Sequence, residues 1–170
     1  MKVYIAGKVS KDSVFGTHNW RDGFCAELEK LSGIKLESLD PIKADVDPAN
    51  VKLVFGCDSY LISQSDVVIV YLSDDISVGG SQEILIAKYL SVPVIGLARH
   101  GGKFNGQTKE YFGKTFENHK DPFVFTSCDI VCETIAEVAD ALKTIKGIKP
   151  KTLDIIPEAI EYYLNSVKSK

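Results

Sequence analysis

Asp58 lies where the sequence pattern predicts an apolar helix face. Residues 48–63 are predicted to form a helix that starts with Asp47 as N-cap and Pro48 at the first helical position. The predicted apolar stripe of this helix consists of Val51, Val54, Phe55, Leu61 and Ile62. Burying a lone carboxylate is costly unless it is paired, hydrogen-bonded or open to a crevice. Asp58 is therefore a candidate site residue; the alternative is an acid at the rim of the stripe, or one bonded to a nearby backbone N–H.

Glu83 shows the same pattern in the glycine-rich segment "SVGGSQEILIAKYL", residues 77–90. A helix is predicted over about residues 80–90, and Glu83 shares with Ala87 and Leu90 the face that packs on a sheet. We expect the helix N-terminus and the amides of residues 79–81 to favour the ionised form of Glu83. The alternative is an acid placed in a first helical turn only because the helix dipole favours it there.

Two such carboxylates have a chemistry in common. An ionised, poorly solvated carboxylate acts as a nucleophile or stabilises a cation. When a leaving group departs from the anomeric carbon of a sugar, an oxocarbenium ion develops that a nearby carboxylate can trap. We assign the trapping role to Glu83, while Asp58 orients it or serves as proton donor or base. The two acids and the glycine-rich turn thus indicate glycosyl chemistry on a phosphorylated or polar sugar.

The elements that position these acids alternate along the chain. Strands are predicted at residues 2–6, 34–39, 67–72, 92–97 and 129–133. Helices are predicted at residues 18–31, 48–63, 80–90, 135–145 and 156–167. The first helix carries the stripe Trp20, Phe24, Leu28 and Leu31, and Thr134 with Glu137 forms a capping box for the fourth. This alternation predicts a doubly wound α/β fold with about five parallel strands.

In such a fold, ligands bind beyond the carboxyl ends of the strands, where the strand order reverses. Gly7, Asp40, residues 73–80 and residues 97–102 follow four of the predicted strands. The glycine-rich turn before Glu83 therefore lies where a ligand is expected.

Two segments depart from the alternating pattern. Residues 99–121 have four glycines, mixed charge and no hydrophobic period, and are predicted to form a long loop or lid. The C-terminal segment, residues 150–170, is predicted to contain a helix whose apolar stripe packs on its own sheet or on a neighbouring molecule, of which we favour the first.

Length and composition predict one domain spanning residues 1–170, because the chain is 45% apolar and 25% charged. The net charge of −3 provides no positive field for nucleic acid or an anionic membrane. There is no apolar run of membrane-spanning length and no signal peptide before "MKVYIAG", so we expect a cytoplasmic protein. Cys25, Cys57, Cys128 and Cys132 are expected to be free thiols.

Several common motifs are missing from the sequence. It has no C-x-x-C pair, no phosphate-binding G-x-x-x-x-G-K-[ST] loop, no G-x-G-x-x-G fingerprint and no G-x-S-x-G elbow. We therefore expect neither a metal nor a cofactor, and these absences count against ATP hydrolysis, dinucleotide redox chemistry and α/β-hydrolase activity.

The chain resembles the nucleoside 2-deoxyribosyltransferase family, which includes the 2′-deoxynucleoside 5′-phosphate N-hydrolases. The resemblance is carried by "VYIAG", "CDSYLISQSDVVIVYL", "VGGSQEILIAKYL" and "VPVI". It is strongest over residues 54–98, collinear to about residue 145, and absent from the last 25 residues. It implies a flavodoxin-like three-layer sandwich with a five-stranded parallel sheet, and a dimer or larger assembly in which a partner subunit completes each site.

The resemblance also implies roles for particular residues. Glu83 corresponds to the glutamate that forms a covalent glycosyl-enzyme, and Asp58 to the helix acid beside it. The substrate-binding positions are Tyr4, Gly7, Ser77, Gly79, Gly80 and Ser81. Members that hydrolyse 5′-monophosphates carry serine six residues before the nucleophile, where base-exchanging transferases carry aspartate; Ser77 therefore favours a nucleotide substrate, with Asp74 and Asp75 close by in sequence. Further candidate phosphate donors are Lys8, Ser10, Lys11 and Arg21.

Four functions follow from these residues. The favoured one is an N-glycosidase acting on (deoxy)nucleoside 5′-monophosphates, with water as acceptor. The second is a nucleoside 2-deoxyribosyltransferase that exchanges bases. The third is a nucleotide-binding module without turnover, which gains nothing from two acids facing an anionic ligand. The fourth is an electron-transfer flavoprotein clamped by Phe15 and Trp20, although Trp20 fits a helix core better.

Overall fold

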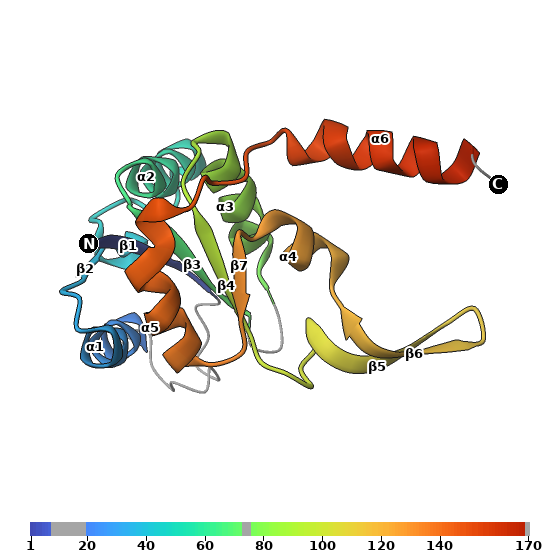
Figure 1. Ribbon diagram of the computed structural model, residues 1–170. Coiled ribbons are helices and arrows are strands. Elements are labelled where there is room, and N and C mark those ends of the chain that lie inside the picture. Colours follow the sequence, from blue (N-terminus) through green and yellow to red (C-terminus); the bar gives the residue numbers. More distant parts are fainter. Residues whose placement is uncertain (8–19, 73–75, 169–170) are drawn as a thin grey trace.

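A five-stranded parallel sheet forms the centre of the computed structural model, which describes residues 1–7, 20–72 and 76–168 (Figure 1). The strand order is β2-β1-β3-β4-β7, the flavodoxin-like order, as predicted. Four of the strands match their predictions closely: β1 (Lys2–Ala6), β3 (Val67–Leu72), β4 (Val94–Ala98) and β7 (Ile130–Cys132). The edge strand β2 (Glu37–Ser38) is shorter than the predicted run of six residues, since it pairs with β1 at only two positions.

Helices cover both faces of this sheet (Figure 1). One layer consists of α1 (Trp20–Ser32) and α5 (Ile135–Thr144), which pack together, and the short 3-10 helix η2 (Ile145–Gly147) follows α5. The other layer consists of α2 (Val51–Ser63) and α3 (Val78–Tyr89), and the short helix α4 (Pro122–Ser127) packs beside α3. A 3-10 helix, η1 (Pro41–Lys43), lies between β2 and α2. The three-layer arrangement is the predicted α/β sandwich.

The strands hold the two layers together because their side chains alternate between the faces. Val67 and Ile69 of β3 pack in the core under α1 and α5, whereas Val68 and Val70 pack under α2 and α3. Such a strand is buried on both sides, and its uninterrupted apolar sequence reflects this.

The stripe predicted for α1 is confirmed at its first three positions. Trp20, Phe24 and Leu28 are buried, and the Trp20 ring packs against Phe24 and Tyr71. Leu31 is exposed because the helix ends at Ser32 and Gly33 turns the chain away with a φ of +71°.

The apolar stripe predicted for α2 is present, but most of it is not buried. Of its five members only Ile62 is fully buried, while Val51 and Phe55 are 80% and 57% exposed. The helix also starts later than predicted: Asn50 is its N-cap and accepts a hydrogen bond from the Leu53 N–H, while Asp47 accepts one from the Ala49 N–H. The pattern marked an apolar face correctly, but the described residues place nothing over most of it.

The loop predicted over residues 99–121 is a β-hairpin along most of its length. Strands β5 (Asn105–Tyr111) and β6 (Lys114–Lys120) pair antiparallel around Phe112 and Gly113, which both have positive φ as a type I′ turn requires. Both faces of the hairpin are largely exposed, so its sequence has no apolar alternation from which strands could be predicted.

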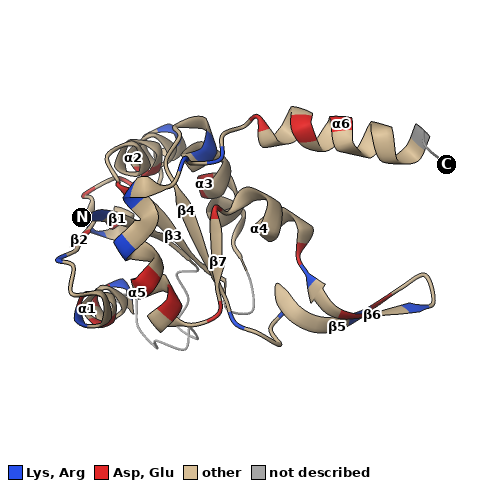
Figure 2. Cartoon of the chain, viewed as in Figure 1, with Lys and Arg blue, Asp and Glu red and all other residues tan. Residues whose placement is uncertain are grey.

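Helix α6 (Ile155–Lys168) is confirmed as a helix, but it does not pack on its own sheet as favoured. It projects from the sandwich, with acidic residues along its first half (Figures 1 and 2), and the side chains described from Ile156 to Val167 are all exposed. The segment before it is anchored: the carboxylate of Asp129, which pairs with the buried Lys88, accepts a hydrogen bond from the Lys151 N–H. No helix in the described part of the chain has the length and apolar character needed to cross a membrane.

Candidate active site

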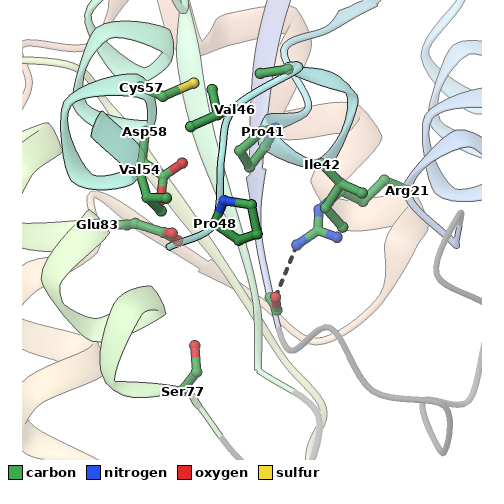
Figure 3. A pocket seen from close by; sticks show the side chains of 12 residues that line it. Arg21, Pro41, Ile42, Val46, Pro48, Val54, Cys57, Asp58, Ser77 and Glu83 are labelled. Carbon is green, nitrogen blue, oxygen red and sulfur yellow. Dashed lines mark hydrogen bonds between the residues drawn. The ribbon is translucent and has the colours of Figure 1, made fainter. Parts of the chain in front are cut away.

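A cavity of about 660 Å³ opens at the carboxyl end of β1, beside the N-terminus of α3 (Figure 3). Its size lies within the usual range of small-molecule sites. The strand order reverses between β1 and β3, so the cavity lies where the topology predicted a ligand. Its polar lining comes from Arg21, Asp58, Ser77 and Glu83.

Glu83 reaches the cavity from the second turn of α3 and is held by Tyr4 of β1. The Tyr4 hydroxyl donates a hydrogen bond of 3.0 Å to Oε1 of Glu83, and the Tyr4 side chain is fully buried. A buried tyrosine needs such a partner for its hydroxyl. Burial raises the pKa of the Tyr4 phenol, and the negative charges of Glu83 and Asp58 raise it further, so Tyr4 stays neutral. Tyr4 thus fixes the orientation of the carboxylate.

Burial raises the pKa of Glu83, and the negative charge of Asp58 raises it further. The hydrogen bond from Tyr4 and the positive charge of Arg21 lower the pKa of Glu83, but they offset only part of the rise. This corrects the expectation that the helix N-terminus favours the ionised form, since loss of hydration outweighs it. When Glu83 ionises, its carboxylate is poorly solvated and correspondingly reactive.

Asp58 faces the same cavity from α2 (Figure 3) and is half-buried. No described residue donates a hydrogen bond to its carboxylate, so the alternative of a bond to a nearby backbone N–H is not what the described residues show. Burial raises the pKa of Asp58, and the positive charge of Arg21 opposes the rise. A carboxyl group with a raised pKa keeps its proton to a higher pH than a free carboxyl group does, as a general acid requires.

Ser77 is the N-cap of α3, where its Oγ accepts a hydrogen bond of 3.0 Å from the Gly80 N–H. Its side chain also lines the cavity, so its hydroxyl is placed to donate to a bound group. Gly80 is buried behind it, and a Cβ there would lie 3.2 Å from the Ile76 side chain. Gly79, Gly80 and Ser81 do not line the cavity, although Gly79 has Glu83 Oε1 within 3.9 Å of where a Cβ would lie.

Ser81 is turned to its own helix, because its hydroxyl donates to the Val78 carbonyl at 2.8 Å. Gly7 lines the cavity where β1 ends, and it must be glycine because a Cβ would lie 2.8 Å from the buried Trp20 ring. Of the eight predicted site residues, Gly7, Asp58, Ser77 and Glu83 face the cavity, and Tyr4 supports them from beneath.

Arg21, predicted only as one of several phosphate donors, is a buried part of the cavity wall. Its Nε donates to the Ile5 carbonyl and its Nη2 to the Gly7 carbonyl, each at 2.9 Å. The other candidate donors, Lys8, Ser10 and Lys11, lie outside the described residues, as do Phe15, Asp74 and Asp75.

Sequence reasoning missed the apolar wall of the cavity, which the connection from β2 to α2 supplies together with α2 itself. Its members are Pro41, Ile42, Ala44, Val46, Pro48 and Val54. The signal was available in the position of this connection, since it leaves the sheet at the carboxyl end of β2. Its apolar side chains suit contact with the face of an aromatic ring.

Neither the models of known families nor the curated proteins contain a match to this sequence. Solved structures do match it. A conserved protein from Enterococcus faecalis V583 is 15% identical and superposes with a TM-score of 0.60 over 84% of this chain and 97% of its own.

A 2-deoxyribosyltransferase from the psychrotolerant bacterium Bacillus psychrosaccharolyticus is also 15% identical, with a TM-score of 0.55 over 89% of this chain and 98% of its own. A CMP N-glycosidase from Clostridium botulinum, BcmB, is 15% identical, with a TM-score of 0.47 over 84% of this chain and 98% of its own. At such identities it is the fold that is shared, and over most of its length this chain has the fold of a solved 2-deoxyribosyltransferase.

Proposed function

We propose that this protein is an enzyme of the nucleoside 2-deoxyribosyltransferase-like group that cleaves the glycosidic bond of (deoxy)nucleoside 5′-monophosphates. The observation that carries the proposal is that Glu83, held by Tyr4, lies beside Asp58 in one cavity, and that no described residue donates a hydrogen bond to the Asp58 carboxylate. The shared fold with a 2-deoxyribosyltransferase supports the same class of chemistry.

In the first step, a carboxylate oxygen of Glu83 attacks the anomeric carbon and the carbon–nitrogen bond to the base breaks. The bonding electrons leave with the base, and Asp58 in its protonated form supplies the proton that neutralises it. Both carboxyl groups have raised pKa values, and two neighbouring acids in one site titrate as a coupled pair. An ionised Glu83 beside a protonated Asp58 is the productive combination.

In the second step, water attacks the anomeric carbon of the glycosyl–Glu83 ester. Asp58, now ionised, accepts a proton from that water as the ester bond breaks and Glu83 recovers its carboxylate. The Tyr4 hydroxyl bonds to Oε1, and this leaves Oε2 of Glu83 for the sugar. The enzyme returns to its starting state with free base and sugar 5-phosphate as products.

The 5′-phosphate is assigned to the N-terminus of α3, where Ser77 lines the cavity. The first backbone N–H groups of a helix have no partners within the helix, and the helix dipole favours an anion there. α3 has twelve residues, so this contribution is that of a full helix.

Base exchange is the second candidate, favoured by the likeness to a 2-deoxyribosyltransferase. The same residues perform the first step, after which a second base in place of water attacks the glycosyl ester. The apolar wall of the cavity serves an incoming base as well as a departing one. A binding module without turnover is disfavoured, because two partly buried acids weaken the binding of an anion.

We also propose that the chain assembles as a homodimer or higher oligomer. A groove of about 830 Å³ lies between α6, α4 and Leu85 of α3, with Phe123, Ile156, Ile160 and Tyr163 in its lining. Apolar side chains are also exposed on α2 and along α6. Contiguous apolar surfaces of this kind mark contacts between proteins, and a second copy of the same chain can cover both.

The function is tested by incubating the protein with ribo- and deoxyribonucleoside 5′-monophosphates and the matching nucleosides, with and without a second free base. Release of base without an acceptor is expected, and it must disappear in Glu83→Gln while persisting in the surface variant Glu158→Gln. Product that forms only with an acceptor base establishes the transferase. Tight binding without product from any substrate overturns both enzymatic readings.

A further inference from the structure

Arg21, on the cavity wall, has one side-chain nitrogen that forms no hydrogen bond with the part of the chain that the structure describes. Arg21 is 3% exposed, and its Nε and Nη2 are bound to the carbonyls at the end of β1. Its third nitrogen, Nη1, is buried and has no hydrogen-bond partner among the described residues. Buried donors of a charged group are normally satisfied, because an unmet one costs the full desolvation of that group. The Nη1 group is therefore suited to donate to a bound molecule.

The surroundings of Arg21 hold its guanidinium rigidly. Its Cζ lies 4.8 Å from the centre of the Trp20 ring, and the two backbone bonds fix the plane from the other side. A donor held in this way binds an acceptor with little loss of side-chain entropy.

The position of Arg21 relative to the proposed reaction decides which part of the substrate it meets. Figure 3 shows Ser77 below Glu83, and Arg21 and Ile42 across the cavity from both. With the phosphate at Ser77 and the anomeric carbon at Glu83, the base extends toward the apolar wall. Arg21, Pro41 and Ile42 line the cavity on that side, where the far edge of such a base would lie.

We propose that Arg21 selects bases that present a carbonyl oxygen at this edge, with Nη1 donating to that oxygen. The proposal rests on the function proposed above, whose substrate class it narrows. Arginine only donates, so an oxo group is bound, whereas the amino group of adenine meets a second donor and leaves the guanidinium unpaired. The site therefore favours bases with an oxo group at the far edge, namely hypoxanthine, guanine, uracil and thymine, over adenine and cytosine, which carry an amino group there.

The same contact assists the reaction. As the glycosidic bond breaks, the bonding electrons pass to the base, and its carbonyl oxygen gains negative charge. A hydrogen bond from a cation to this oxygen strengthens as the charge develops, so Arg21 stabilises the transition state more than the ground state.

The sharpest comparison uses the 5′-monophosphates of 2′-deoxyinosine and 2′-deoxyadenosine, whose bases differ at the six-position. For the wild-type protein we expect kcat/KM to be 10- to 100-fold higher for the inosine substrate, in line with a charge-assisted hydrogen bond. Binding of both nucleotides to Glu83→Gln, measured by calorimetry, separates recognition from leaving-group reactivity and should show the same order.

In Arg21→Lys, discrimination between the two nucleotides should fall to within a few-fold, because an ammonium group cannot keep both backbone bonds and reach the base. The matched control is Arg99→Lys, which changes the chain's other arginine on an exposed surface and should keep the wild-type ratio. If Arg21→Lys does not fold, the purine 2′-deoxyriboside 5′-monophosphate, which lacks a six-substituent, replaces it: its affinity for Glu83→Gln should lie between those of the other two.

The outcomes separate the two proposals. Equal or better use of the adenine nucleotide overturns the role of Arg21 while leaving the N-glycosidase intact. Absence of base release from every nucleotide overturns the N-glycosidase, and the binding order on Glu83→Gln then decides the role of Arg21 alone. An unchanged ratio of kcat/KM between the two nucleotides in a folded Arg21→Lys variant also overturns the role of Arg21.

Discussion

The cavity and the C-terminal helix are opposite exceptions to the rule that charges are exposed and apolar side chains are buried. In the cavity, Glu83 and Asp58 are partly removed from water, and this burial raises the pKa of each. On α6, Ile160 and Tyr163 are 55% and 63% exposed. Both arrangements cost stability in an isolated chain, so each indicates a requirement other than folding.

The two exceptions differ in how they are held. Glu83 is fixed by a hydrogen bond from Tyr4, and Arg21 by two bonds to backbone carbonyls. The described hydrogen bonds that anchor α6 to the sandwich come from the segment before it, where Lys151 donates to carbonyls at the end of α4. Rigid, costly polar groups are typical of a reactive site, and a projecting apolar helix is typical of a surface that another molecule covers. Each of the following changes should affect one region and leave the other intact.

Glu83→Gln should have the largest effect on activity. Loss of the nucleophile should lower kcat by about 10³-fold or more, while the amide keeps the shape of the side chain and its contact with Tyr4. The melting temperature should rise, because a poorly solvated charge is removed. Steady-state kinetics and calorimetry measure the two effects. Near wild-type turnover would remove Glu83 from the mechanism.

Asp58→Asn should lower kcat by about 10²-fold, the usual contribution of a positioned acid or base. Since no described residue donates a hydrogen bond to the carboxylate, stability should be unchanged or slightly increased. Thermal unfolding followed by circular dichroism checks this. A melting temperature several degrees lower would show instead that Asp58 supports the fold.

Ser77→Ala should raise KM for 5′-monophosphates by about 10-fold and leave unphosphorylated nucleosides nearly unaffected, in keeping with one hydrogen bond to a charged group. The substitution also removes the cap of α3, at a cost of about 1 kcal/mol. Thr134→Ala, which removes the equivalent cap of α5 away from the cavity, controls for that loss. Equal effects on nucleotides and nucleosides would place the phosphate elsewhere.

The pH dependence of stability should report the buried carboxyl groups directly. Their pKa values are raised on folding, so the folded state binds more protons than the unfolded state, and stability falls as pH rises from about 4 through the folded values. Glu83→Gln has one fewer of these carboxyl groups, so its stability should fall less than that of wild type as pH rises. Its advantage in melting temperature over wild type should be small at pH 4 and should grow until Glu83 is fully ionised. An advantage that shrinks with pH would mean that the site favours the charged form.

Much of the sheet could be predicted because its strands are buried on both faces, as in the unbroken apolar run of β3. The hairpin could not, because β5 and β6 are exposed and carry no apolar alternation. Periodicity also cannot tell whether an apolar helix face has a partner. Val51 and Phe55 of α2 follow the pattern and are nevertheless exposed.

The two acids of the site could be predicted because each interrupts the apolar face of a predicted helix. Acids on apolar faces drew attention to Asp58 and Glu83, and the order of the strands placed both at one edge of the sheet. What holds them was not predictable from pattern alone, because Tyr4 and Glu83 are 79 residues apart in sequence and meet only through the pairing of β1 with β3. The free nitrogen of Arg21 likewise becomes visible only once its other two bonds are known.

Removal of α6, by ending the chain after Leu153, should have the smallest effect on the isolated fold. The described side chains of α6 are exposed from Ile156 onward, so in dilute solution the free energy of unfolding should change by less than about 0.5 kcal/mol, as for other surface changes. If a second copy covers this helix, the melting temperature of the full chain should rise with protein concentration and that of the shortened chain should not. Light scattering should then give a smaller mass for the shortened chain. If both chains instead behave alike at every concentration, then α6 does not mediate self-association, and its apolar face must serve a partner of a different kind.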